Sequence, residues 1–154
     1  MPLNDILAAP VVLPALKAKN KKQVLQLLAA KAATSSGRSE REIFDTLLQR
    51  ERLGSTGVGR GVAIPHGKLS KLDRLYGLFA RLERPVEFDA LDGEPVDLVF
   101  LLLAPEGAGA DHLKALARVA RLLRDEKTAE KMRSARDADA LFALLTEPSA
   151  SHAA

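Results

Sequence analysis

The sequence contains no cysteine, no tryptophan, one tyrosine and five phenylalanines. The absence of cysteine excludes disulfide bonds, thiolate metal sites and a thiolate nucleophile, and it fits a reducing compartment. Because aromatic residues are scarce, the hydrophobic core must be mainly aliphatic. No apolar run approaches the roughly 18 residues of a transmembrane helix, and the N-terminus lacks the pattern of a secretory signal. These absences predict a soluble, cytoplasmic protein with no membrane insertion.

The charge is close to balanced, with 23 basic and 20 acidic side chains and a formal net charge of +3. Arg118, Arg121 and Arg124 recur on one side of an expected helix, which is typical of a solvated helix face. No aromatic side chains are interleaved with these arginines to stack on bases. Nucleic-acid binding is therefore disfavoured.

Helical and extended patterns alternate along the 154 residues. Asn20 and the Ser39–Glu42 capping box predict helix starts, while a nearly continuous apolar stretch predicts a strand covered on both faces. The expected helices are 21–33, 40–52, 111–124, 128–134 and 139–147, and the expected strands are 11–13, 62–66, 75–82, 86–88 and 95–104. This order predicts a single-domain α/β sandwich over residues 1–154, with a mixed β-sheet and helices on both faces. Its core spans about 3–147, and 148–154 form a flexible tail.

The segment Gly57–Lys68 carries the strongest functional signal. Pro65 and Gly67 flank His66, so we expect a strand that ends at this imidazole, followed by a sharp turn. Upstream, within about 17 residues, lie Arg50 at a helix end and the hydroxyls of Ser55 and Thr56. Individually, these residues are compatible with a dipole-complementing arginine and ordinary turn formers. Together they supply the groups for moving a phosphoryl group through an imidazole.

A second histidine, His112, follows the predicted buried strand through a short loop. Asp111 is the expected N-cap of the next helix, whose positive end favours a nearby anion. Alone, His112 is compatible with a surface residue in a first helical turn, and His152 is given no role. The glycines match neither the Walker pattern nor the dinucleotide pattern, and no metal-ligand cluster is visible. We therefore expect no metal and no cofactor.

The stretch Arg50–Lys68 resembles the active-site signature of the fructose/mannitol-type enzyme IIA proteins of the bacterial phosphoenolpyruvate-dependent phosphotransferase system. Leu3–Leu7, Gly67-Lys68-Leu69 and the run Leu101–Pro105 followed by Asp111-His112-Leu113 are most similar to its nitrogen-regulatory branch. The resemblance covers the chain from Leu3 to about Thr146 and implies the same single-domain fold.

The resemblance implies that His66 is the phosphorylated nucleophile, and that Arg50 and His112 complete the catalytic set. Ser55, Thr56 and Asp111 would form the phosphate environment. Arg60 departs from the family, which usually has a neutral or acidic residue there, often asparagine. A cation at this position would strengthen phosphate attraction or alter the choice of partner.

The implied donor is a histidine-containing phosphocarrier protein of the nitrogen branch, and the implied role is a phosphotransferase component that is mainly regulatory. Leu53, Val58 and Leu69 are candidates for its docking patch. The regulated proteins, by resemblance, include potassium transporters or sensor kinases, and a homodimer is compatible with the sequence. Two alternatives stay open: a sugar-specific enzyme IIA that passes phosphate to a separate enzyme IIB, and a regulatory binding module that is never phosphorylated.

Overall fold

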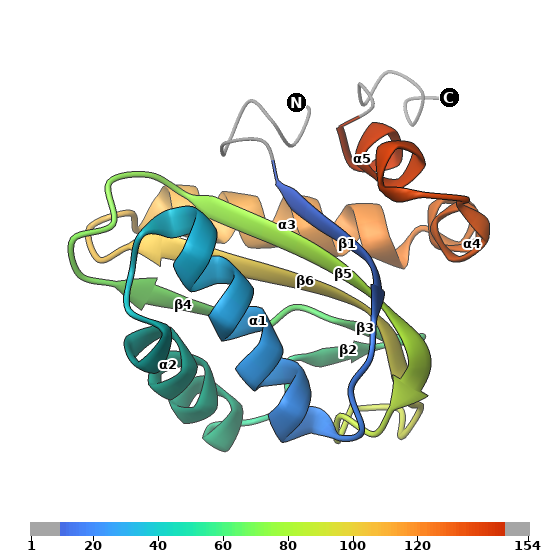
Figure 1. Ribbon diagram of the computed structural model, residues 1–154, viewed down its shortest axis with the longest axis horizontal. Coiled ribbons are helices and arrows are strands. Elements are labelled where there is room, and N and C mark those ends of the chain that lie inside the picture. Colours follow the sequence, from blue (N-terminus) through green and yellow to red (C-terminus); the bar gives the residue numbers. More distant parts are fainter. Residues whose placement is uncertain (1–9, 147–154) are drawn as a thin grey trace.

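The computed structural model describes residues 10–146, which form a sheet with helices on both faces (Figure 1). In chain order the elements are β1 (Val11–Leu16), α1 (Lys21–Ser36), α2 (Glu40–Arg52), β2 (Gly57–Gly59), β3 (Val62–Ala63), β4 (His66–Leu69), β5 (Tyr76–Val86), β6 (Val96–Pro105), α3 (Ala110–Arg124), α4 (Glu126–Ser134) and α5 (Ala138–Thr146). None of the helices within this range combines the length and apolar character needed to cross a membrane. The expected tail from residue 148 lies outside the described residues.

The sheet has the order β1-β5-β6-β3-β2, and β4 also pairs with β6. The β1–β5, β3–β6 and β4–β6 pairs are parallel, whereas the β5–β6 and β2–β3 pairs are antiparallel. In Figure 1, α1 and α2 lie in front of the sheet and α3 lies behind it. The predicted α/β fold with a mixed sheet and helices on both faces is confirmed.

The central strand β6 explains why both faces need helices. Successive side chains of a strand point to opposite faces, and from Leu98 to Ala104 both sets in β6 are apolar and buried. Those that pack toward α1 and α2 are Val99, Leu101 and Leu103, and those that pack toward α3, α4 and α5 are Leu98, Phe100, Leu102 and Ala104. The prediction that this run is covered on both faces is therefore confirmed.

Three helix ends follow the expected chemistry. The Asn20 side chain accepts a hydrogen bond from the Gln23 amide at 2.8 Å, and Gly37 closes α1 with a φ of 76°. Because the left-handed cap comes only at Gly37, α1 continues to Ser36, three residues past the predicted end. The Ser39 hydroxyl caps α2 by accepting from the Glu42 amide at 3.2 Å.

The first strand continues through Pro14, which corrects the prediction that it stops before this proline. Since β1 lies at the edge of the sheet, the missing N–H of proline leaves no ladder partner unpaired. The predicted short strand at 86–88 was also wrong in extent, because Val86 is the last residue of β5.

His66 does not end a strand, as the sequence suggested, but begins β4. Val62 of β3 pairs with Leu98 and His66 pairs with Leu102, so both short strands keep one register along β6. Pro65 interrupts the line because it has no N–H, although its carbonyl still accepts from the Leu102 amide at 2.9 Å. The imidazole is therefore fixed to the central strand through its own backbone.

Gly67 allows α2 to pack closely against β4. The prediction of a sharp turn after His66 was therefore wrong. Gly67 lies within β4, and a Cβ atom there would come within 2.5 Å of Cγ2 of Thr46 in α2. Only glycine lets α2 approach β4 this closely, and this approach brings the end of α2 beside His66.

Candidate functional site

Both ring nitrogens of His66 are engaged. Nδ1 lies 2.8 Å from the Ile64 carbonyl oxygen, and Nε of Arg50 donates to Nε2 at 3.3 Å. A carbonyl can only accept and an arginine can only donate, so the proton sits on Nδ1 and the lone pair sits on Nε2. The partly buried ring is therefore a neutral imidazole that presents Nε2 to a cation.

Burial lowers the pKa of His66 below its ordinary value of 6.5, and the charge of Arg50 lowers it further. The hydrogen bond to Ile64 and the charge of Glu51 act in the opposite direction. Because the lowering effects dominate, the nucleophilic neutral form prevails at neutral pH.

Arg50 comes from the last turn of α2, and the chain that follows holds it in place. Its Nη1 donates to the Gly54 carbonyl oxygen at 2.9 Å, while its Nε faces His66. The planar, permanently charged guanidinium therefore lies beside Nε2 of His66, a geometry suited to phosphoryl oxygens.

His112 joins the site from α3. Its ring centroid lies 5.6 Å from that of His66, with the two planes at 68°. The side chain is buried, and its Nε2 has no hydrogen-bond partner among residues 10–146. Burial lowers the pKa of His112, and the charges of His66 and Lys68 add to this effect. An unsatisfied buried nitrogen is costly, so its position beside His66 favours a functional role.

Asp111 is not the N-cap of this helix, contrary to the sequence prediction. Helix α3 begins one residue earlier, its N-cap is Gly109, and no side chain caps it. Gly109 has a left-handed φ of 48°, which allows the turn from which the helix begins at Ala110. Asp111 is an exposed residue of the first turn, where its carboxylate complements the helix dipole.

The hydroxyls of Ser55 and Thr56 bind protein groups. Ser55 Oγ donates to the Phe88 carbonyl oxygen at 2.6 Å, and Thr56 Oγ1 donates to Oε2 of Glu51. Thr56 is buried, and its amide also donates to Oε1 of Glu51 at 3.0 Å. These contacts order the loop between α2 and β2.

Arg60, the departure from the family pattern, sits at the tip of the β2–β3 hairpin with a φ of 58°. Its guanidinium pairs with Glu126 of α4 at 3.1 Å, and its carbonyl accepts from Arg133 at 2.8 Å. The side chain is thus directed to α4. Asparagine suits the same left-handed backbone better than arginine does.

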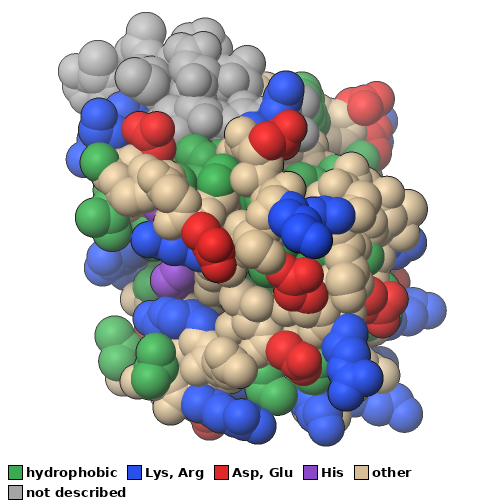
Figure 2. Space-filling model, turned by 90° about the vertical axis from the view of Figure 1, so that its left-hand side faces the viewer, with side chains coloured by type: hydrophobic (Ala, Val, Ile, Leu, Met, Phe, Trp, Pro, Cys, Tyr) green, Lys and Arg blue, Asp and Glu red, His purple; other side chains and the backbone are tan. Residues whose placement is uncertain are grey.

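The face around the histidines is basic and partly apolar. Figure 2 shows histidine side chains at this surface between lysine and arginine side chains, with hydrophobic side chains along the same edge. Leu53, just after α2, is 85% exposed, and Leu113, next to His112, is 68% exposed. Val58 is partly exposed, but Leu69 is buried in the core, so its expected place in a docking patch was wrong.

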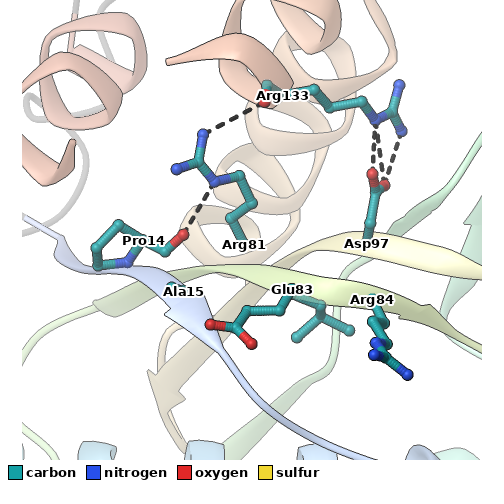
Figure 3. A pocket seen from close by; sticks show the side chains of 8 residues that line it. Pro14, Ala15, Arg81, Glu83, Arg84, Asp97 and Arg133 are labelled. Carbon is teal, nitrogen blue, oxygen red and sulfur yellow. Dashed lines mark hydrogen bonds and ion pairs between the residues drawn. The ribbon is translucent and has the colours of Figure 1, made fainter. Parts of the chain in front are cut away.

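A hollow of about 550 Å³ lies by β1, β5, β6 and α4 (Figure 3). Arg81 donates to the carbonyls of Pro14 and Met132, both at 2.9 Å, and Arg133 forms a bidentate pair with Asp97. Glu83 and Arg84 point to the other side of β5 (Figure 3). The polar groups that line the hollow therefore join α4 to the sheet, and they do not converge on one position where a ligand could bind.

The lowered pKa values of the two histidines lead to a pH prediction. Because their pKa values are lowered from 6.5, both imidazoles should stay neutral until the pH falls below 6.5. The unfolded chain takes up protons first, so the free energy of unfolding should decline as the pH falls from about 6.5 through the two folded-state pKa values. An NMR titration of the imidazole Cε1–H signals, with thermal unfolding at each pH, measures both effects. A His66 that titrates at or above 6.5 would contradict the neutral-imidazole description.

Comparison with known proteins gives a consistent result. Residues 5–147 match the family described as phosphoenolpyruvate-dependent sugar phosphotransferase system, EIIA 2. A nitrogen regulatory protein of Bradyrhizobium diazoefficiens is 63% identical over 153 residues, which cover 99% of this chain and 100% of that protein.

Solved structures agree with this match. The crystal structure of nitrogen regulatory protein IIA-Ntr from Neisseria meningitidis has a TM-score of 0.86 at 36% identity, covering 94% of this chain and 99% of that one. Enzyme IIA-Mtl of Escherichia coli, in its complex with phosphorylated enzyme IIB-Mtl, has a TM-score of 0.74 at 20% identity. That match covers 90% of this chain and 96% of the other, and at this identity it shows the fold alone.

Proposed function

Because this chain belongs to the EIIA 2 family of the phosphoenolpyruvate-dependent phosphotransferase system, we propose that it is a nitrogen-regulatory enzyme IIA. In this proposal it accepts a phosphoryl group on His66 from a histidine-containing phosphocarrier protein. The observation that carries the proposal is the imidazole itself, whose Nδ1 is held by Ile64 and whose Nε2 faces Arg50.

The chemical step is an exchange of one N–P bond for another. The Nε2 lone pair of His66 attacks phosphorus, and the N–P bond to the carrier imidazole breaks. The electron pair of that bond returns to the carrier nitrogen, and the Nδ1 proton of His66 stays in place. Positive charge develops on the His66 ring as the bond forms, and the Ile64 carbonyl that accepts from Nδ1–H stabilises it.

Two side chains then serve the transferring group. Arg50 moves its hydrogen bond from Nε2 to the phosphoryl oxygens, where a planar guanidinium stabilises their charge. In the neutral tautomer that carries its proton on Nε2, His112 donates to one of these oxygens, and its Nε2 so gains the partner that it lacks. The positive end of α3 near Asp111 adds attraction for the anion. Ser55 and Thr56 act through the loop that they order.

The carrier docks on the face that contains the nucleophile. Leu53 and Leu113, which are both exposed, offer apolar contacts, and the exposed Lys68 offers a positive charge. Phosphorylation adds nearly two negative charges to this basic face, which changes the partners that it attracts. The proposal places this exchange in the cytoplasm, with transporters or sensor kinases among the regulated proteins.

The experiment is a phosphorylation assay with a choice of donors and acceptors. The protein is incubated with phosphoenolpyruvate, enzyme I and either the nitrogen-branch or the sugar-branch carrier, and the labelled peptide is identified. We expect rapid labelling of His66 by the nitrogen-branch carrier and slower labelling by the other. Efficient onward transfer to an enzyme IIB would favour sugar transport, and no label with either carrier would favour a pure binding module.

A further inference from the structure

Glu51 is a buried carboxylate beside the site, and it has no role in the proposed reaction. It lies in the last turn of α2, on the same face as Ile43 and Leu47, which pack into the core. Its side chain is 4% exposed, and a buried carboxylate is costly unless it is paired and hydrogen-bonded. Glu51 is satisfied by three donors: the Thr56 amide at 3.0 Å, the Thr56 hydroxyl, and Nζ of Lys21 at 2.9 Å.

These donors come from different parts of the chain. Lys21 is the first residue of α1, Glu51 belongs to the end of α2, and Thr56 lies in the loop before β2. Lys21 is placed by further contacts, since its Nζ lies 4.8 Å from the centre of the Phe88 ring and 3.7 Å from Asp89. Glu51 thus fixes the end of α2 against two other segments.

A continuous set of bonds leads from Glu51 to each nitrogen of His66. On one side, the Thr56 carbonyl accepts from the Ile64 amide at 3.0 Å, and the Ile64 carbonyl is the group bound to Nδ1 at 2.8 Å. On the other side, the neighbouring residue Arg50 donates to Nε2. The two groups that orient the ring are therefore both anchored at Glu51.

The carboxylate also acts on the charge of the ring. Its negative charge raises the pKa of His66 and so opposes Arg50, which lowers it. His112 and Lys68 are the other charged or titratable groups of the site, and the charges of His66 and Lys68 both lower the pKa of His112. Since attack by neutral imidazole puts positive charge on the ring, a fixed negative charge nearby stabilises the product of that step.

We propose that Glu51 is a positioning residue for phosphoryl transfer: with Lys21 and Thr56 it holds Arg50 and Ile64 against His66, and its charge offsets that of Arg50. This inference rests on the proposed function for its kinetic part only. Its structural part concerns the unphosphorylated protein and can be measured separately.

The test compares Glu51→Gln, Lys21→Met and Thr56→Val with the wild-type protein. Glu51→Gln removes a negative charge, so the pKa of His66 should fall, and transfer from the carrier should slow roughly tenfold to a hundredfold, the scale of a misplaced reacting group. Lys21→Met leaves the carboxylate without its cation, so the pKa of His66 should rise. Thr56→Val keeps the charge and loses the hydroxyl, so transfer should slow with little change in the pKa of His66.

Glu40→Gln is the matched control, because Glu40 is an exposed glutamate at the start of the same helix. It should leave the pKa of His66 and the transfer rate unchanged. A Glu51→Gln protein that melts at a lower temperature, yet keeps both the pKa of His66 and the transfer rate, would overturn the inference. If the Glu51→Gln protein does not fold, the other two variants decide. A raised pKa of His66 in Lys21→Met and slow transfer in Thr56→Val support the inference. A wild-type pKa of His66 in Lys21→Met together with a wild-type transfer rate in Thr56→Val overturns it. Failure of the wild-type protein to accept label would count against the proposed function, while the pKa comparison would still decide the role of Glu51.

Discussion

His66→Ala should abolish acid-labile phosphorylation of the protein, whereas His152→Ala should leave it intact. The physical reason lies in the protonation, the hydrogen bonds and the exposure of the imidazole rings. Among residues 10–146, only His66 combines a neutral imidazole with an Nε2 lone pair that faces an arginine. His112 is 7% exposed and its Nε2 is buried, so it is less accessible to the carrier than the partly buried His66. The measurement is labelling from phosphoenolpyruvate through enzyme I and the carrier, followed by acid treatment and peptide mapping.

The His66→Ala protein needs a control for folding. Its imidazole is only partly buried, and β4 is held by backbone pairing with β6, so removal of the ring should leave the sheet intact. Circular dichroism and thermal unfolding check this point. If a folded His66→Ala protein still takes up acid-labile phosphate, the nucleophile is another residue and the proposed mechanism is wrong.

Sequence patterns predicted the layers of this fold because burial has a simple signature. The run from Val99 to Leu103 has no polar position, which indicated a strand covered on both faces. Helix starts at Asn20 and Ser39 were predicted because a side chain caps each of them. The start of α3 was misplaced since Gly109 caps it through its backbone, which leaves no side-chain signal.

The candidate site was only partly predictable. Arg50, His66 and His112 stood out by residue type and local context, and the structure brings all three together. The carbonyl of Ile64 and the carboxylate of Glu51 were missed. A carbonyl has no sequence signal, because every residue has one. Glu51 did carry one: Ile43, Leu47 and Glu51 are four residues apart, so a glutamate occupies a core-facing position of an amphipathic helix.

Arg50→Ala should slow phosphoryl transfer to His66 by roughly 10³ or more, the scale of an arginine that stabilises a transferring phosphoryl group. The guanidinium is fixed by the Gly54 carbonyl at 2.9 Å and lies 3.3 Å from the attacking nitrogen. Arg50→Lys should restore only part of the rate, because an ammonium ion cannot offer the planar fork. His112→Ala should have a milder effect, since it removes one donor. The measurement is rapid-quench labelling from the phosphorylated carrier.

The matched control is Arg52→Ala, which removes an exposed arginine from the same helix turn and should leave the chemical step unchanged. A second readout separates catalysis from helix stability. Since the charge of Arg50 lowers the pKa of His66, Arg50→Ala should raise that pKa, and Arg52→Ala should not. A slow Arg50→Ala protein with an unchanged pKa of His66 would mean that the arginine acts at a distance from the ring. Wild-type kinetics in that variant would reduce Arg50 to a charge that complements the end of α2.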